Sequence, residues 1–166
     1  VGEISQMIRG RKVLLLAPGM SLLSDYEKIL KFIEAERPCV ISVNFMDSRY
    51  PIDAYFVSNH KRMDIMGQDI GPEEQTRTIL TSNISERGSG EYMYVDYDRY
   101  TNSDEMVSDN AGLMLLKLLK QCGADDVTLA GFDGFRHGRG GNYYSKDLIF
   151  EVNEAEAVEK QERIRQ

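Results

Sequence analysis

A strand-to-helix turn near the start of the chain points most directly to chemistry. Residues 12–24 read Lys-Val-Leu-Leu-Leu-Ala-Pro-Gly-Met-Ser-Leu-Leu-Ser, so an apolar run ends at Pro18-Gly19 and a helical pattern follows. The N-terminus of a helix carries free backbone N–H groups and a partial positive charge, and a phosphate can bind there without a basic side chain. The alternative is an ordinary strand-to-helix turn, because the turn contains neither Gly-x-Gly-x-x-Gly nor Gly-Lys-Ser/Thr.

Small or amide residues follow several of the predicted strands. Asn44, Asn59 and Asn83 stand at the ends of three successive strands, and Gly131 and Asp133 follow a later one. Ligands of open parallel sheets bind outside the carboxyl ends of the strands. Amide side chains there suit ribose hydroxyls and base edges, whereas the alternative is that Asn simply favours turns. Asp133 could likewise bond a ribose, bind a metal, or serve as a turn residue.

A second helix start lies at residues 109–112, which include Asn110 and Ala111. Its small residues would let a ligand approach free backbone N–H groups. Plain N-capping of the helix explains the same residues. Tyr143 and Tyr144, beyond a glycine-rich stretch, could close over a ligand or anchor the core.

Groups that could transfer protons or hold a metal are few in this sequence. Only His60 and His137 titrate near neutral pH by their intrinsic pKa. No Ser-His-Asp set or suggestive carboxylate pair is recognised, so no catalytic residue is assigned. Cys39 and Cys122 lie in or beside apolar segments without metal-ligand spacing, which favours buried thiols over a disulfide or a metal site.

The elements that position these residues alternate along the chain. Apolar runs predict strands at about 12–17, 39–43, 54–57, 78–81 and 127–130, and one short strand at 92–95 within a long loop over 84–108. Helical patterns predict helices over 24–36, 60–66 and 109–122. The first has Ser24 and Glu27 in capping-box spacing, and Gly123 ends the last. This alternation predicts a single three-layer, Rossmann-like α/β domain with a mostly parallel sheet over residues 1–152, followed by a helical tail over 153–166.

Composition narrows the possible partners. The 166 residues are 42% hydrophobic and 28% charged, with a net charge of −7, which argues against nucleic acid and anionic membranes as partners. No apolar run approaches the roughly 20 residues of a membrane span, and no signal peptide is visible, so we expect a cytoplasmic protein. The chain begins at Val1 with a helical pattern, which suggests a fragment of a longer protein.

The spaced motifs together resemble the bacterial sialyltransferases that use CMP-sialic acid. The motifs are Leu-Ala-Pro-Gly-Met-Ser-Leu at 16–22, Val-Asn-Phe at 43–45, Val-Ser-Asn at 57–59, Asn-Ala-Gly at 110–112 and Leu-Ala-Gly-Phe-Asp at 129–133. The resemblance implies that Gly19 and Ser21 face phosphate and that Asn44 and Asn59 hold nucleotide and sugar. It also implies that Asp133 holds the ribose.

The sequence differs from that family at positions that the resemblance implicates in sialyl transfer. Asn110 and Ala111 stand where the family has a Thr-Ser pair, so Ala111 lacks the hydroxyl, and Ala17-Pro18 replaces Gly-Asn in the first turn. The chain has no counterpart of the family's catalytic His. We therefore expect no sialyl transfer by this chain alone.

A closer resemblance is to the C-terminal domain that follows an aldolase-like barrel in bacterial surface-polysaccharide clusters, in proteins resembling 4-hydroxy-2-oxovalerate aldolase. It rests on Gly-Arg-Lys-Val-Leu-Leu-Leu-Ala-Pro-Gly at 10–19, Ile-Ser-Val-Asn-Phe at 41–45 and Phe-Val-Ser-Asn-His-Lys-Arg at 56–62. The resemblance implies that lyase chemistry belongs to a barrel outside this chain. Domains similar to hydroxymethylpterin pyrophosphokinase share the first-turn pattern but match less well.

The resulting expectation is a domain that binds a nucleotide or nucleotide-sugar, CMP being one possible ligand, at the carboxyl edge of its sheet. The expected site residues are Gly19, Ser21, Asn44, Asn59, Asn110, Ala111, Gly131, Asp133 and Tyr143. One alternative is a non-catalytic dimerisation or accessory domain for the aldolase barrel. Another is an active glycosyltransferase or pyrophosphotransferase.

The acidic tail suggests a way to self-associate. The pairs Glu156-Lys160 and Glu159-Arg163 have the favourable i,i+4 order for a helix. The apolar residues at 148–152 would anchor this helix either to the core of its own chain or to a second copy, giving a homodimer.

Overall fold

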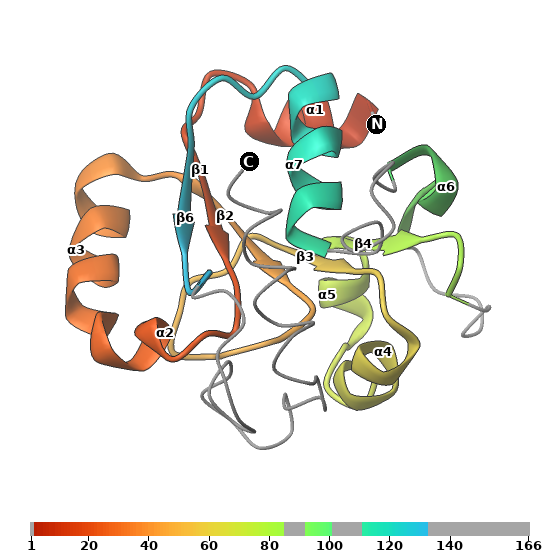
Figure 1. Ribbon diagram of the computed structural model, residues 1–166, viewed down its shortest axis with the longest axis horizontal. Helices are drawn as coiled ribbons and strands as arrows, with labels where there is room; N and C mark the ends of the chain where they lie inside the picture. Colours follow the sequence, from red (N-terminus) through yellow and green to blue (C-terminus); the bar gives the residue numbers. More distant parts are fainter. Residues whose placement is uncertain (1, 85–91, 101–110, 133–166) are drawn as a thin grey trace, which may run out of the picture.

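One open sheet of six parallel strands forms the centre of the computed structural model, which describes residues 2–84, 92–100 and 111–132 (Figure 1). The strands are β1 (Val13–Leu16), β2 (Cys39–Val43), β3 (Ala54–Val57), β4 (Thr78–Thr81), β5 (Met93–Val95) and β6 (Val127–Ala130). Their order across the sheet is β5-β4-β3-β2-β1-β6, and every neighbouring pair is parallel. The predicted Rossmann-like α/β architecture is confirmed at this level.

Helices cover both faces of the sheet in the described residues. They are α1 (Gly2–Ile8), α2 (Ser21–Ser24), α3 (Tyr26–Glu36), α4 (His60–Met66), α5 (Pro72–Gln75), α6 (Tyr97–Tyr100) and α7 (Ala111–Gln121). Side chains of α1, α6 and α7 pack into the core on one face, and those of α2, α3 and α4 pack on the other. The predicted three layers are therefore present (Figure 1).

The continuous apolar runs explain why the sheet is central. Every residue of β1 to β4 is buried, as expected for parallel strands that are covered on both faces. Successive side chains alternate between the two cores, so that Leu15 lies in one and Leu14 and Leu16 lie in the other. The free thiols of Cys39 and Cys122 are both buried, as the sequence predicts.

The helix predicted over 24–36 differs from the structure at its start. Helix α2 already begins at Ser21, the chain bends at Asp25, and α3 begins at Tyr26 without a side-chain cap, so the Ser24 capping box is wrong. The Tyr50 hydroxyl donates to the Leu22 carbonyl at 2.5 Å. That carbonyl would accept the Tyr26 N–H in an unbroken helix, which accounts for the break between α2 and α3.

The other helix predictions fare better. Helix α4 matches 60–66, and α7 matches 109–122 in its described part. Gly123 ends α7 with a φ of 94°, while Gly123 N and Ala124 N donate to the carbonyls of Lys120 and Leu119 in a Schellman motif. The segment predicted as a loop contains one helical turn, α6, after the short strand β5. The domain boundary at 152 and the tail helix lie outside the described residues.

Candidate functional site

The carboxyl ends of all six strands lie along one edge of the sheet, because every pair is parallel. From β1 the chain moves outward through β2, β3 and β4 to β5, and then β6 returns to the other side of β1. The direction of strand order therefore reverses between β1 and β6. Crevices for ligands in open α/β sheets form outside the carboxyl ends of the strands at such a reversal.

The backbones of the two strand ends approach closely at this reversal. The Ala17 N–H donates to the Ala130 carbonyl at 2.9 Å, and Gly131 follows with a φ of 79°. A Cβ atom at position 131 would overlap the Ala17 carbonyl oxygen and lie 2.8 Å from Leu22 Cγ. Glycine is thus required at 131 by sterics, in addition to any part in ligand binding.

The turn after β1 carries the two predicted phosphate-facing residues. Gly19 is buried and its carbonyl accepts the Leu22 N–H at 3.1 Å, whereas Ser21 is the half-buried first residue of α2. Because α2 has only four residues, the macrodipole of the long helix predicted here does not point at this turn. The turn after β1 is a candidate ligand site because it lies at the strand reversal, and not because of a helix dipole.

Two of the strand-end asparagines are bound into a cross-strand network that we call the amide ladder (Asn44, Ser58 and Asn83). The Ser58 N–H donates to Asn44 Oδ1 at 2.9 Å, and Asn44 Nδ2 donates to Ser58 Oγ at 3.4 Å. Asn83 Nδ2 donates to the Ser58 carbonyl at 3.1 Å, and Asn83 Oδ1 accepts the Thr81 hydroxyl. Both the oxygen and the nitrogen of each amide are hydrogen-bonded within the protein. This agrees with the alternative that Asn44 and Asn83 have a structural role at the strand ends.

Asn59 behaves differently from the other two asparagines. Its Oδ1 accepts the Arg62 N–H at 3.2 Å and so caps α4. Asn59 is exposed. Within the described part of the chain, its Nδ2 group makes no hydrogen bond. An amide donor at the carboxyl end of β3 therefore remains for a ligand.

The first turn of α4 adds positive charge to this edge. It contains His60, Lys61 and Arg62 and no acidic residue, although cations at a helix N-terminus oppose the dipole. Arg62 is only 2% exposed, which is unusual for a charged side chain. Neither Arg62 nor Ser58 is among the site residues predicted from the sequence. The run of three basic residues in an acidic chain was the available signal for Arg62, and nothing local marked Ser58.

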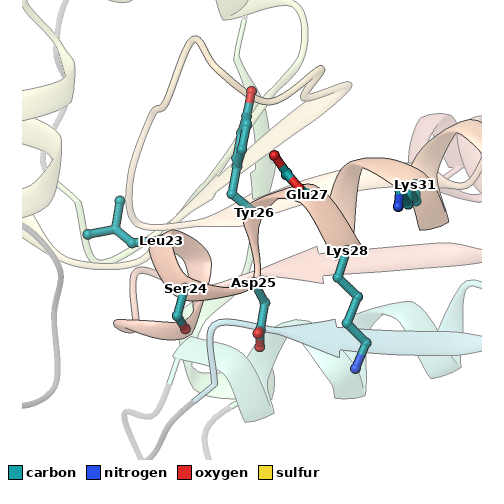
Figure 2. Close-up of a pocket in the computed structure, with 7 residues that line it drawn as sticks. All are labelled: Leu23, Ser24, Asp25, Tyr26, Glu27, Lys28 and Lys31. Carbon is teal, nitrogen blue, oxygen red and sulfur yellow. The ribbon is translucent and has the colours of Figure 1, made fainter.

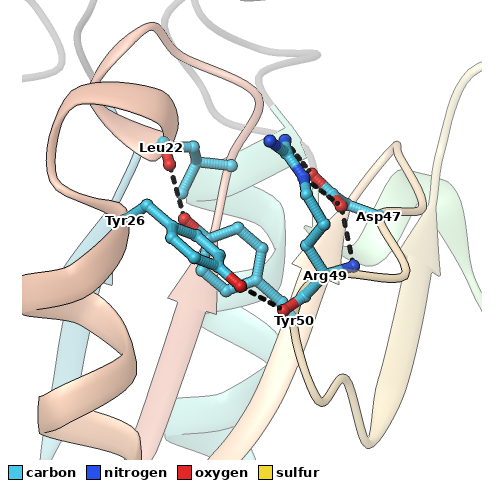
Figure 3. Close-up of polar contacts among 5 residues, drawn as sticks. All are labelled: Leu22, Tyr26, Asp47, Arg49 and Tyr50. Atoms are coloured by element: carbon cyan, nitrogen blue, oxygen red, sulfur yellow. Dashed lines mark hydrogen bonds and ion pairs between the residues drawn. The ribbon is translucent and has the colours of Figure 1, made fainter.

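The loop between β2 and β3 is fastened to α2 and α3 (Figure 3). The bond from the Tyr50 hydroxyl to the Leu22 carbonyl is accompanied by one from Tyr26 to the Arg49 carbonyl at 3.2 Å. The two tyrosine rings meet edge to face at 5.2 Å, and Arg49 forms a two-pronged ion pair with Asp47. Burial raises the pKa of Tyr50 to about 12, so its hydroxyl stays a donor at neutral pH.

An open hollow of about 640 Å³ lies beside the bend between α2 and α3 (Figure 2). It is lined by Leu23, Ser24, Asp25, Tyr26, Glu27, Lys28 and Lys31. These residues come from one continuous stretch, and Figure 2 shows Tyr26 and Lys28 pointing in opposite directions. The lining side chains do not converge, and none is a predicted site residue, so the hollow is the outer surface of a bend.

The described residues contain little catalytic apparatus. No group of three or more His, Cys, Asp or Glu residues in this part of the chain could hold a metal ion. Burial raises the pKa of the Cys39 thiol to about 11, which makes it a poor nucleophile at neutral pH. No described helix is long and apolar enough to cross a membrane.

Of the four remaining predicted site residues, Ala111 lies within the described part of the chain. Ala111 is the half-buried first residue of α7, whose C-terminal end leads into the start of β6, so α7 begins on the side of the carboxyl edge. Asn110, Asp133 and Tyr143, together with His137 and Tyr144, lie outside the described residues. The structure therefore brings Gly19, Ser21, Asn44, Asn59 and Gly131 to one edge of the sheet.

No protein-family model, curated protein or solved structure matches this chain.

Proposed function

We propose that this domain binds a nucleotide or nucleotide-sugar at the carboxyl edge of its sheet, in the region where β1 and β6 lie side by side. The single observation that carries the proposal is the reversal of strand order between β1 and β6. Gly19, Ser21 and Gly131 all belong to this reversal, where Ser21 is half-buried and Gly131 lets the two strand ends lie close together.

The chemistry of the neighbouring strand ends supports a ligand with both neutral and anionic parts. The Asn59 amide donor suits a ribose hydroxyl or a base edge, and the basic first turn of α4 suits phosphate. The amide ladder is uncharged and holds β2, β3 and β4 in place, so that Asn59 is presented from a fixed strand end.

The wider proposal follows from the motifs of the sequence. The chain is proposed to be a sialyltransferase-like C-terminal domain of an aldolase-type protein from bacterial surface-polysaccharide metabolism, acting in the cytoplasm. Its partner is then an aldolase-like barrel, which supplies the lyase chemistry, and CMP is the first ligand to test. The missing hydroxyl at Ala111 and the missing counterpart of the family's catalytic His argue against the transfer step, so the proposal is limited to nucleotide binding.

Calorimetric titration with CMP, UMP and AMP tests the proposal. Binding should weaken by about 1–3 kcal/mol in Asn59→Ala, because a donor to the ligand is lost. Asn59→Ser is the matched variant, since its hydroxyl still caps α4 but cannot reproduce the amide donor. Loss of binding in Asn59→Ser with an unchanged melting temperature supports the site. No heat and no thermal shift with any nucleotide at millimolar concentration contradicts it.

A second candidate function is an accessory domain for the barrel without any ligand of its own. The specific observation in its favour is that Asn44 and Asn83 use both ends of their amides to hold the sheet together. The same titration distinguishes the nucleotide-binding function from the accessory function. If the domain is only an accessory domain, the fully folded chain should bind no nucleotide.

A further inference from the structure

Strand β6 forms one edge of the described sheet, with β1 on one side and no described strand on the other. The register with β1 pairs Leu15 with Leu129, and the β1 groups bond to the carbonyls of Asp126 and Ala130. In a parallel ladder, alternate residues direct their backbone groups toward the partner strand. The N–H and C=O groups of Val127 and Leu129 therefore point toward the free edge.

The side chains of β6 also differ from those of its neighbours. Leu129 is 47% exposed, whereas Leu15, directly beside it, is completely buried. Val127, on the same face as Leu129, packs partly against the core that includes α7, and Thr128 and Ala130 occupy the opposite face. No proline or lysine in β6 protects this edge from pairing with a further strand.

We infer that the free edge of β6 is a docking site for residues 148–152 of the same chain, which would add to it as a further strand. These residues lie outside the described part of the structure. Their sequence, Leu-Ile-Phe-Glu-Val, is the densest apolar stretch after Phe132. It places Leu148, Phe150 and Val152 on one face of a strand, with Ile149 and Glu151 on the other.

The two faces of this segment match the two faces of β6. Leu148, Phe150 and Val152 would lie beside Leu129 and cover it, while Ile149 and Glu151 would lie beside Thr128 and Ala130. A register shifted by one residue would put Glu151 on the apolar face, so the pattern favours one set of alignments.

The tether between β6 and the segment permits this arrangement. Residues 133–147, which include a glycine-rich stretch, could extend to about 50 Å, far more than the ~4.8 Å between adjacent strands. A segment on the same chain also has an effective local concentration in the millimolar range. A second copy of the protein, by contrast, must approach against a net charge of −7 on each chain.

Disulfide trapping in the full chain tests the inference. Leu129→Cys is combined in turn with Leu148→Cys, Phe150→Cys or Val152→Cys, and in matched controls with Ile149→Cys or Glu151→Cys. The native thiols of Cys39 and Cys122 are buried and stay in place. Mild oxidation with glutathione disulfide followed by peptide mapping should show intramolecular bonds at least about tenfold more abundant for 148, 150 or 152 than for 149 and 151. This is expected because a disulfide requires Cβ atoms about 3.5–4.5 Å apart, on the same face of adjacent strands.

Each other outcome overturns the inference. Equal trapping at all five positions means that the segment contacts Leu129 without forming a strand, and no trapping means that it does not reach β6. Dimers joined through the single Leu129→Cys substitution mean that a second copy occupies the edge. Hydrogen exchange provides an independent readout: the Leu129 amide should lose protection in Phe150→Asp and keep it in Glu151→Gln. Equal exchange in these two variants contradicts the proposed pairing.

Discussion

The two edges of the sheet are held together by different chemistry. At the carboxyl edge, uncharged groups join the strand ends through the amide ladder and the close contact between Ala17 and Gly131. At the amino edge the residues that precede the strands form ion pairs. Lys12 Nζ lies 3.0 Å from Glu36 and 3.9 Å from Asp126, and Arg11 lies 3.6 Å from Asp53.

This difference indicates that the amino edge has a structural role, whereas the carboxyl edge is the one proposed to bind a ligand. The ion pairs of the amino edge are about two-fifths exposed, so water and salt weaken them. Their charges are also already compensated. The amide ladder adds no charge of its own, and the first turn of α4 contains basic residues and no acidic one. Four predictions test this comparison.

The largest effect is expected from Gly131→Ala at the carboxyl edge. The added Cβ overlaps the Ala17 carbonyl in a backbone with positive φ, and we expect a loss of about 3–5 kcal/mol in urea unfolding. Gly10→Ala at the amino edge is the control, because Gly10 also has positive φ but has no atom within 4 Å of the added Cβ. It should lose only about 1–2 kcal/mol. If Gly131→Ala and Gly10→Ala lose the same stability, the overlap with the Ala17 carbonyl has no measurable cost.

Asn44→Ala should have the next largest effect, about 2–3 kcal/mol, because two hydrogen bonds to Ser58 are lost. Asn44 also adopts a φ of 60°, which Asn tolerates better than Ala. At the amino edge, Asp53→Ala removes the acceptor of the Val40 N–H and the Arg11 pair, at a cost of about 1 kcal/mol. Denaturant midpoints of the two variants give the comparison, and a larger loss in Asp53→Ala would reverse it.

Tyr50→Phe should cost about 1 kcal/mol at neutral pH, since the bond to the Leu22 carbonyl is lost. Its pKa of about 12 in the folded state exceeds the ordinary value of 10, so folding favours the neutral phenol. The associated stability is complete below pH 10 and is lost as the pH rises toward 12. Melting temperatures should fall less steeply over this range in Tyr50→Phe than in the wild type. If melting temperature falls equally with pH in both proteins, Tyr50 is not the source of the loss of stability at alkaline pH.

The smallest effect is expected from Lys12→Met at the amino edge. The hydrogen bond and charge of Glu36 raise the pKa of Lys12 above 10.5, so the pair persists at neutral pH and is lost as the pH rises through that raised value. Unfolding midpoints should depend less on NaCl concentration in Lys12→Met than in the wild type. Asn83→Ala, which breaks the amide ladder, should keep the wild-type salt dependence. A smaller salt dependence in Asn83→Ala than in the wild type would contradict the uncharged character of the amide ladder.

The comparison also shows which site predictions were accessible from sequence. Asn44, Asn59 and Asn83 were recognised together as strand-end amides, and all three reach the carboxyl edge. Their different uses were not predictable, because the partner of Asn44 is Ser58, on the neighbouring strand. That pairing follows from the register that sets Val43 beside Phe56. The break between α2 and α3 was missed for a similar reason, since its cause is Tyr50, which is distant in the sequence.

The sequence by itself determined the strands, the principal helices and the two apolar faces of the sheet. Short apolar runs bounded by turn residues must be buried on both sides, and this requirement is local. Only the tertiary structure decided that β6 returns beside β1, that Gly131 must be glycine, and that Asn59 keeps an amide donor while Asn44 and Asn83 do not. The physical reason is that burial depends on a residue's own side chain, whereas a hydrogen-bond partner depends on which distant strand lies beside it.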